Sequence, residues 1–213
     1  MRRLALFLVT LLAPLVAAAK GLPGESIVKP ARPGDRASEY ELRPDGGLFR
    51  RISGHTCQVA ADVEDFEIAK HPEDGAVAYF VRHGALHALP PARPWAACPR
   101  AEAQQVARLG ALGYRLVASP ASRVLALVTD ESDTLHVVAA GGDAAVVPEV
   151  ADVALNPCFG AKRKSFSSYV GFALGKSGYV VKIDGKSPAA SKPDSSRAYR
   201  SLREFQRLNR VCR

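Results

Sequence analysis

Residues 66–81 read FEIAKHPEDGAVAYFV, and this stretch decides which secondary structure the chain forms. Phe66 and Ile68 alternate with polar residues, which is the two-residue period of a half-buried β-strand. A turn containing Pro72 follows, and residues 76–81 are then apolar without interruption. A short, wholly apolar run bounded by turn residues is typical of a strand that is buried on both faces. The stretch therefore predicts two strands that are connected by a proline turn.

The same arrangement returns at residues 114–128, which read YRLVASPASRVLALV. In both copies a short polar turn leads from the apolar strand into one more strand, at residues 86–89 and 135–138. A looser third copy, with an insertion, covers residues 153–183. Repetition of one supersecondary unit along a chain indicates that similar units stack against one another. We expect an all-β, antiparallel meander.

The turns of these units resemble those of β-propeller blades, in which a turn of the form x-Pro-Asp-Gly separates an outgoing strand from the apolar middle strands. The matching turns are residues 71–75, residues 119–122 and, in a first hairpin, residues 43–46, whereas residues 156–158 depart from the form. The resemblance covers roughly residues 40–183. It implies propeller-like repeats, with room for about four blade-like units of about 40–50 residues each. The alternative is an irregular β-sandwich.

The N-terminus has the pattern of a secretory signal peptide. Arg2 and Arg3 precede an apolar stretch over residues 4–16, and three alanines at 17–19 supply the small residues that a signal peptidase requires. A transmembrane anchor is the weaker reading, because the stretch is shorter than the ~20 apolar residues of a span. The expected organisation is a signal peptide over residues 1–19, an extended lead-in over 20–37 and one β-rich domain over 38–213. We expect the protein to be exported, to the periplasm or the medium.

Four cysteines follow the predicted cleavage site, which suits an oxidising compartment. No two of them are close enough in sequence for a C-x-x-C motif, so neither a zinc site nor thioredoxin-like chemistry is indicated. Three pairings are possible. Pairs close in sequence form first in a chain of successive hairpins, which favours Cys57–Cys98 and Cys158–Cys212. The second bridge would attach the C-terminal segment to the body of the domain.

Two segments have helical composition. Residues 99–112 are ambiguous, because their helix propensity competes with their position, where an outer blade strand would lie. Residues 195–211 place apolar side chains at steps of three and four, which predicts an amphipathic helix with Asp194 or Ser195 as its N-cap. Its expected apolar face consists of Tyr199, Leu202, Phe205, Leu208 and Cys212.

Charge is distributed unevenly along the chain. Residues 159–213 hold 13 Lys or Arg against 3 Asp or Glu, whereas acidic residues outnumber basic ones over residues 20–158. A basic face can simply be solvated, or it can bind anionic lipid, glycan or an acidic protein through bidentate arginine contacts. Nucleic acid is the least expected partner of an exported chain without a nucleic-acid module. The candidate anion-binding residues are Lys162, Arg163, Lys164, Arg197, Arg200, Arg203, Arg207 and Arg210.

Motifs for catalysis or cofactor binding are missing from the sequence. It contains no nucleophile elbow, no phosphate-binding loop and no dinucleotide fingerprint. His83 and His87 are four residues apart, yet Gly84 lies between them and a third metal ligand is lacking. His87 and His136 occupy equivalent places in the repeat, which indicates structural roles. We therefore expect no cofactor, no metal and no catalytic residue.

The sequence thus favours an exported, non-enzymatic binding or interaction module whose basic C-terminal third faces an anionic envelope component or an acidic protein. Two alternatives stay open. One is a hydrolase or lyase of cell-envelope polymers, which would need a histidine and a carboxylate gathered in one pocket. The other is a structural envelope protein.

Overall fold

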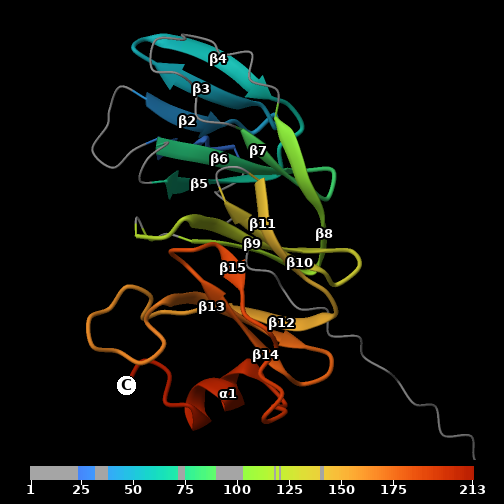
Figure 1. Cartoon of the computed structure of the whole chain (residues 1–213). Coiled ribbons are helices and arrows are strands. Elements are labelled where there is room, and N and C mark those ends of the chain that lie inside the picture. The colour runs from blue at the N-terminus through green and yellow to red at the C-terminus, as the bar shows by residue number, and fades with distance from the viewer. Residues whose placement is uncertain are drawn as a thin grey trace, which may run out of the picture.

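The architecture comes from a computed structural model, which describes residues 24–31, 38–71, 75–89, 103–117, 119, 121–139 and 142–213. Within these residues the chain forms fifteen strands in three sheets and one short helix, and each strand pairs antiparallel with its neighbours. The sheets lie one above another along the molecule, and the helix lies at the end of the stack (Figure 1). The predicted all-β, antiparallel fold class is confirmed.

The first sheet has the strand order β1-β2-β3-β4. Its strands are β1 (Ile27–Pro30), β2 (Ser38–Leu42), β3 (Leu48–Ile52) and β4 (His55–Ala60). The β2–β3 hairpin turns at Gly46, whose φ of +80° suits glycine. The side chain of Asp45 stabilises this turn by accepting a hydrogen bond from the Gly47 amide, at 2.9 Å. The hairpin expected around residues 43–47 is therefore present.

The second sheet has seven strands in the order β11-β10-β9-β8-β7-β6-β5. They are β5 (Asp65–His71), β6 (Gly75–Arg82), β7 (Ala85–Leu89), β8 (Gln104–Leu116), β9 (Val124–Asp130), β10 (Leu135–Ala139) and β11 (Gly142–Val147). The long strand β8 pairs with β7 through its first residues and with β9 through its last ones. It passes Gly110 on the way, where a Cβ would lie 2.0 Å from the carbonyl oxygen of Asp130. The sheet is thus two four-stranded meanders that share β8.

The third sheet has the order β12-β13-β14-β15. Its strands are β12 (Val150–Leu155), β13 (Tyr169–Gly175), β14 (Val180–Asp184) and β15 (Ala189–Ala190), and helix α1 (Leu202–Leu208) follows. Counted by meander, the described chain holds four four-stranded units, as expected from the repeats. The sheets are not closed into a ring.

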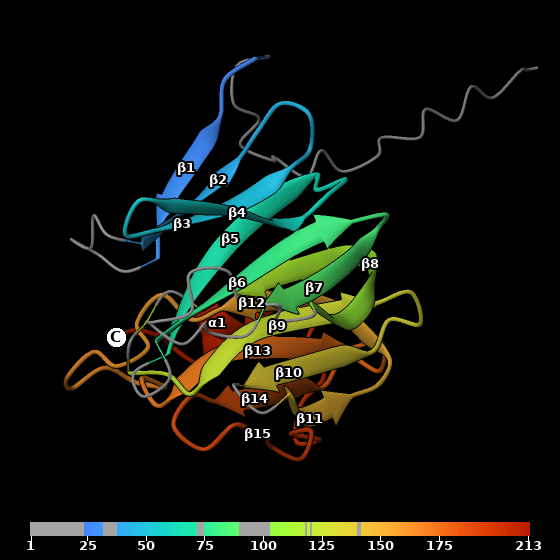
Figure 2. The same cartoon turned by 90° about the horizontal axis from the view of Figure 1, so that it is seen from above.

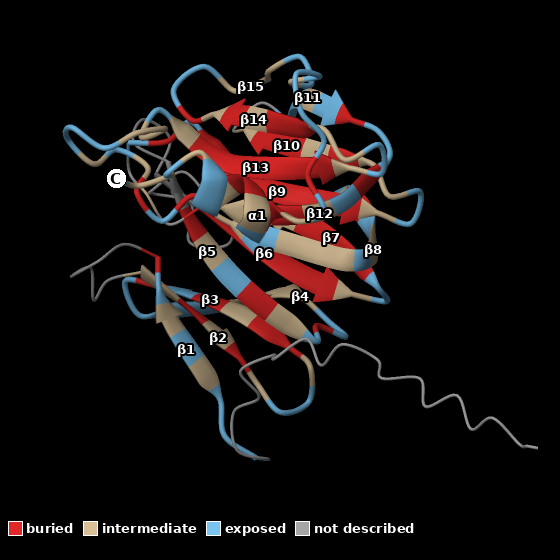
Figure 3. Cartoon of the chain, turned by 90° about the horizontal axis from the view of Figure 1, so that it is seen from below, coloured by how far each residue is buried: buried red, intermediate tan, exposed pale blue. Residues whose placement is uncertain are grey.

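Apolar side chains form clusters between successive units. Figure 2 shows the units from above. One cluster, around Tyr40 and Phe80, lies between the first sheet and β5–β7. A second, around Tyr79 and Leu125, joins the two halves of the seven-stranded sheet, and a third, around Leu127 and Val181, joins it to the last sheet. The middle strands are the most buried, in agreement with their unbroken apolar sequences (Figure 3).

Two details differ from the expectation. The turn at residues 43–46 connects the second and third strands of its unit, whereas the turns at 71–75 and 119–122 precede the second strand of theirs. The ambiguous segment is a strand over its described part, because β8 supplies the pairing edge for both β7 and β9. Backbone pairing on two sides outweighs the helix propensity of its alanines and glutamines.

The C-terminal helix is shorter than predicted. It covers Leu202–Leu208 instead of residues 195–211, and its N-cap is Ser201, whose hydroxyl accepts a hydrogen bond from the Glu204 amide. Upstream, Asp194 instead caps a local turn by accepting from Ser196. Leu208 was expected on the apolar face but is 40% exposed. Leu208 is the last residue of the helix, and the chain bends two residues later at Arg210, with a φ of +52°.

One predicted disulfide is confirmed. Cys158 is bonded to Cys212, which attaches the C-terminus to the β12–β13 loop. Cys57 is also disulfide-bonded, but its predicted partner Cys98 lies outside the described residues, so that pairing stays a prediction. The predicted signal peptide and most of the lead-in lie outside them as well. No helix within the described ranges has both the length and the apolarity needed to cross a bilayer.

Candidate functional site

The predicted anion-binding residues all belong to the end of the stack that helix α1 covers. Lys162, Arg163 and Lys164 lie in the β12–β13 loop, Arg203 and Arg207 lie on α1, and the remaining three lie on either side of it. All eight side chains are exposed. Among the described residues, none of the eight forms an ion pair with a carboxylate. Their charges are therefore available to a ligand.

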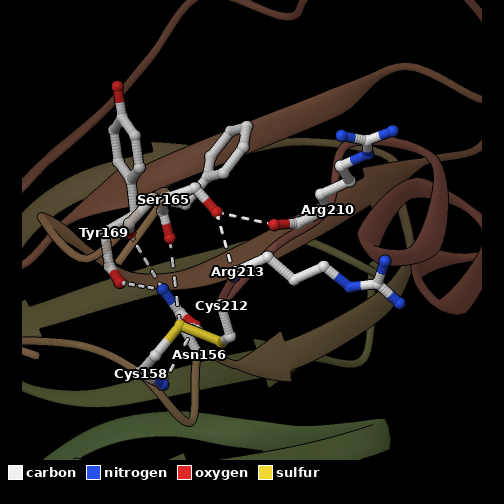
Figure 4. The surroundings of a disulfide bond; sticks show 8 residues. Asn156, Cys158, Ser165, Tyr169, Arg210, Cys212 and Arg213 are labelled. Atoms are coloured by element: carbon white, nitrogen blue, oxygen red, sulfur yellow. Dashed lines mark hydrogen bonds between the residues drawn. A yellow bond between two sulfur atoms is a disulfide. The ribbon is translucent and has the colours of Figure 1, made fainter. Parts of the chain in front are cut away.

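Ser165 joins two of these segments (Figure 4). Its hydroxyl donates to the carbonyl oxygen of Arg210 at 2.6 Å, and its amide donates to the carbonyl oxygen of Arg213 at 3.1 Å. These bonds hold the C-terminal tail beside the loop that carries Lys162–Lys164. The sequence argument missed Arg213, which the tail brings into this group. Arg213 could have been included from the sequence, because it directly follows Cys212, which was predicted to attach the tail to the domain.

Asn156 fixes the same loop from inside. This residue is 5% exposed, and its side-chain amide donates to the carbonyl oxygens of Phe166 and Tyr169 at 2.9 and 2.8 Å (Figure 4). Its carbonyl oxygen accepts from the Cys158 amide at 3.2 Å. An internal network in which each group has a partner makes a loop rigid. The basic loop thus has a fixed backbone, although it lies outside the sheet.

An aromatic cluster supports the platform beneath these residues. Phe205 packs against Phe172 and Tyr199, each with ring centroids 5.2 Å apart, and against Phe166 at 5.8 Å. Arg197 places its guanidinium 5.6 Å from the centre of the Tyr199 ring. The structure gives no contact that brings Arg197 or Arg200 to the Lys162–Lys164 loop. The eight predicted residues therefore form a loop-and-tail group, in which contacts join the segments, and a more dispersed group along the helix.

A second constellation surrounds His136 on β10. Its Nδ1 lies 2.6 Å from Asp143 Oδ2, and its Nε2 lies 3.0 Å from Asp130 Oδ2. Burial lowers the pKa of His136, but hydrogen bonds to the two carboxylates and their charges raise it more, so the net shift is upward. A shallow recess beside it is lined by Val106, Ala107, Arg108, Asp130, Glu131, Ser132 and His136. Both ring nitrogens are hydrogen-bonded to carboxylates in this structure, so the recess gathers one histidine with the carboxylates of Asp130 and Glu131.

His83 and His87 have no hydrogen bond to a carboxylate among the described residues. His83 is exposed at a turn with a φ of +51°. His87 is 7% exposed and stacks on Phe80, with ring centroids 5.1 Å apart. Burial, with help from the charges of Arg82 and His83, lowers the pKa of His87. Within the described ranges no group of three His, Cys, Asp or Glu side chains could hold a metal ion.

Comparison with known proteins identifies no family. No protein-family model matches the sequence, and no curated protein matches it. Two solved structures overlap with it in part. A variant of KlHsv2 with loop 6CD replaced by a Gly-Ser linker is 10% identical, with a TM-score of 0.40, over 75% of this chain and 50% of that one. The calcium-binding protein regucalcin from Agrobacterium tumefaciens str. C58 is 14% identical, with a TM-score of 0.29, over 79% of this chain and 46% of that one.

This chain thus spans about half the length of either structure. At such TM-scores the two overlaps carry no argument about function.

Proposed function

We propose that the protein is an exported binding module whose basic C-terminal end binds an anionic component of the cell envelope. The observation that supports the proposal best is the loop-and-tail group of Lys162, Arg163, Lys164, Arg210 and Arg213. These side chains are exposed and lack a carboxylate partner in the described structure, while the Cys158–Cys212 bridge fixes their backbone. A disulfide also suits an oxidising, exported location.

Anionic lipid head groups are the first ligand to test. Each Lys or Arg near an anionic surface contributes about 1 kcal/mol to binding, and salt screens the attraction. Arginine also forms bidentate hydrogen bonds with phosphate. Acidic glycans or acidic proteins would use the same charges, and the choice of probe separates them.

The experiment is vesicle sedimentation at low salt, with phosphatidylglycerol vesicles against phosphatidylcholine vesicles. Replacing Lys162, Arg163 and Lys164 by Gln removes three charges and should weaken binding to the anionic vesicles about 100-fold. A matched control replaces Arg43, Arg51 and Arg108 by Gln, which removes the same net charge from the other sheets. The control should bind nearly as well as the unmodified protein.

Equal loss in the two variants would mean that net charge, and not this surface, attracts the protein. Absence of binding to anionic vesicles together with retention on heparin would move the proposal to an acidic glycan. Absence of both would favour the structural envelope role. The hydrolase or lyase alternative has one observation in its favour, because Asp130, Glu131 and His136 line one recess. His83 and His87 do not line this recess.

A further inference from the structure

The layer between the first sheet and β5–β8 contains every buried polar side-chain atom that lacks a hydrogen-bond partner among the described residues. These atoms are Ser38 Oγ, Arg50 Nε, Arg50 Nη1 and His87 Nδ1. Strand alternation assigns them to this layer: Ser38 shares a face with Tyr40, Arg50 with Leu48, and His87 with Leu89. The layers farther along the stack have no such atom in the part of the chain that the structure describes.

Arg50 is the costly member of this set. It is 7% exposed, its Nε and Nη1 have no hydrogen-bond partner, and no carboxylate pairs with it among the described residues, whereas burying a charge without a counter-charge destabilises a protein. Tyr40 lies directly opposite it on β2, and the guanidinium is 5.6 Å from the centre of that ring. Tyr40 gives Arg50 a hydrogen-bond acceptor but not a negative charge, because burial raises the pKa of the phenol despite the charge of Arg50 and its hydrogen bond, which lower it.

The neighbouring carboxylates are engaged elsewhere. Glu39 and Glu41 lie on the opposite face of the first sheet, where they pair with Arg51, and Glu41 also pairs with Arg43. Lys29 makes an instructive contrast, since it lies on the same cross-strand row as Tyr40 and Arg50. Lys29 pairs with Glu67 and donates to the carbonyl oxygen of Phe66 at 2.6 Å.

We propose that this layer binds a small oxyanion, a carboxylate or a phosphate, through Arg50 and Ser38. Ser38 is diagonal to Arg50 across β2 and β3 and lies on the same face of the sheet, so both donors belong to one layer. The guanidinium is planar and prefers oxyanions to spherical ions. The site is separate from the exposed basic surface at the other end of the stack.

The test measures the melting temperature at constant ionic strength while sodium chloride is exchanged for sodium acetate, phosphate or sulfate. Binding predicts a saturable rise of roughly 5–10 °C for an oxyanion at about 100 times its Kd. Acetate acting alone would assign the site to carboxylates, whereas phosphate or sulfate acting alone would assign it to a tetrahedral anion. The NMR signal of the Arg50 Nε–H should shift over the same concentration range.

Arg50→Met should abolish the oxyanion-specific rise, and Ser38→Ala should weaken it. Arg51→Gln is the matched control, since Arg51 is the next residue on the exposed face, and it should keep the full effect. The variant with Gln at positions 162–164 should keep it too, which separates this site from the surface under Proposed function. If Arg50→Met does not fold, the proposal is tested by the melting temperatures of the unmodified protein and of Ser38→Ala and by the NMR signal of Arg50.

The proposal would be overturned by equal melting temperatures in chloride and in all three oxyanions. It would also be overturned if Ser38→Ala kept the full rise in melting temperature and the Arg50 signal did not shift.

Discussion

The two ends of the stack treat their buried polar groups differently. At the C-terminal end, the side chain of Asn156 is buried and fully hydrogen-bonded within the protein. It donates to two backbone carbonyl oxygens and accepts from the Cys158 amide. At the N-terminal end, Arg50 is buried to nearly the same degree, and the described residues supply no carboxylate to its charge. One end therefore satisfies its buried polar groups with its own residues, whereas the other leaves buried donors without a partner among the described residues. The basic surface lies at the C-terminal end, where the backbone is fixed in advance.

The largest expected effect comes from breaking the C-terminal end at its centre. Phe205 is 2% exposed and packs against the three aromatic rings of Phe166, Phe172 and Tyr199. Phe205→Ala should lower the free energy of unfolding by about 3–5 kcal/mol, because it removes a large buried ring and leaves a cavity. Urea unfolding followed by circular dichroism measures this loss.

Leu208→Ala is the control on the same helix. Leu208 is 40% exposed, so its truncation should change stability by less than about 0.5 kcal/mol. Similar losses in the two variants would show that α1 does not dock through Phe205, and the contrast between the ends would lose its basis.

Removal of the bridge is the next prediction. In the double variant Cys158→Ala, Cys212→Ala the free energy of unfolding should fall by about 2–4 kcal/mol. The main reason is that the unfolded chain gains conformational entropy when the bridge between residues 54 positions apart is removed. The variant is preferable to a reducing agent, which would also attack the disulfide of Cys57. Amide exchange should accelerate at Arg213, whose amide donates to Ser165 Oγ, and stay unchanged in β9. Unaltered exchange at Arg213 would mean that Ser165 alone holds the tail.

The sequence predicted the repeating strands and the main features of the C-terminal end, but not the buried charge at the N-terminal end. The apolar runs of β6, β9 and β13 showed the repeating strands, because burial on both faces leaves a continuous hydrophobic signature. The Cys158–Cys212 pairing also followed from the sequence. The predicted C-terminal helix was too long. The apolar period of the sequence runs on from Tyr199 to Leu208, whereas in the structure the helical backbone begins only after Ser201 and has ended before Arg210.

The N-terminal end was missed because its main feature depends on strand register. Leu48, Arg50 and Ile52 occupy alternate positions of β3, and this two-residue period places a charge on the buried face. That period was visible in the sequence. Whether a carboxylate would meet Arg50 was not, since that depends on which strand pairs with β3 and which sheet packs over it.

His136 and His87 give the smallest expected effect and the finest test of the comparison. They occupy equivalent positions on β10 and β7, opposite Val128 and Phe80. His136 lies between two carboxylates and its pKa is raised, whereas burial lowers the pKa of His87. A histidine whose pKa is higher in the folded state stabilises the fold below its unfolded pKa of about 6.5, and that stabilisation is lost as pH rises through the folded pKa.

Asp130 acts in the opposite direction. Burial raises its pKa, but hydrogen bonds from His136 and from the amides of Thr134 and Ser132 lower it more. Its contribution is therefore present above its ordinary pKa of 3.8 and disappears as pH falls through the lower folded value. The ion pairs of His136 with Asp130 and Asp143 should therefore stabilise the fold most between about pH 4 and 6.5, and this stabilisation should decrease on either side of that window.

The measurement is urea unfolding between pH 4.5 and 8.5 for the unmodified protein and for His136→Gln. We expect the variant to lose about 1 kcal/mol near pH 5.5, as for partly exposed ion pairs, and less at pH 8.5. His55→Gln, which changes an exposed histidine on the first sheet, is the matched control. His87 predicts the reverse dependence, because protonating a buried neutral histidine destabilises the fold as pH falls. A His136→Gln curve parallel to the unmodified one would show that the carboxylates do not hold a charged imidazole, and the two histidines would then differ in position alone.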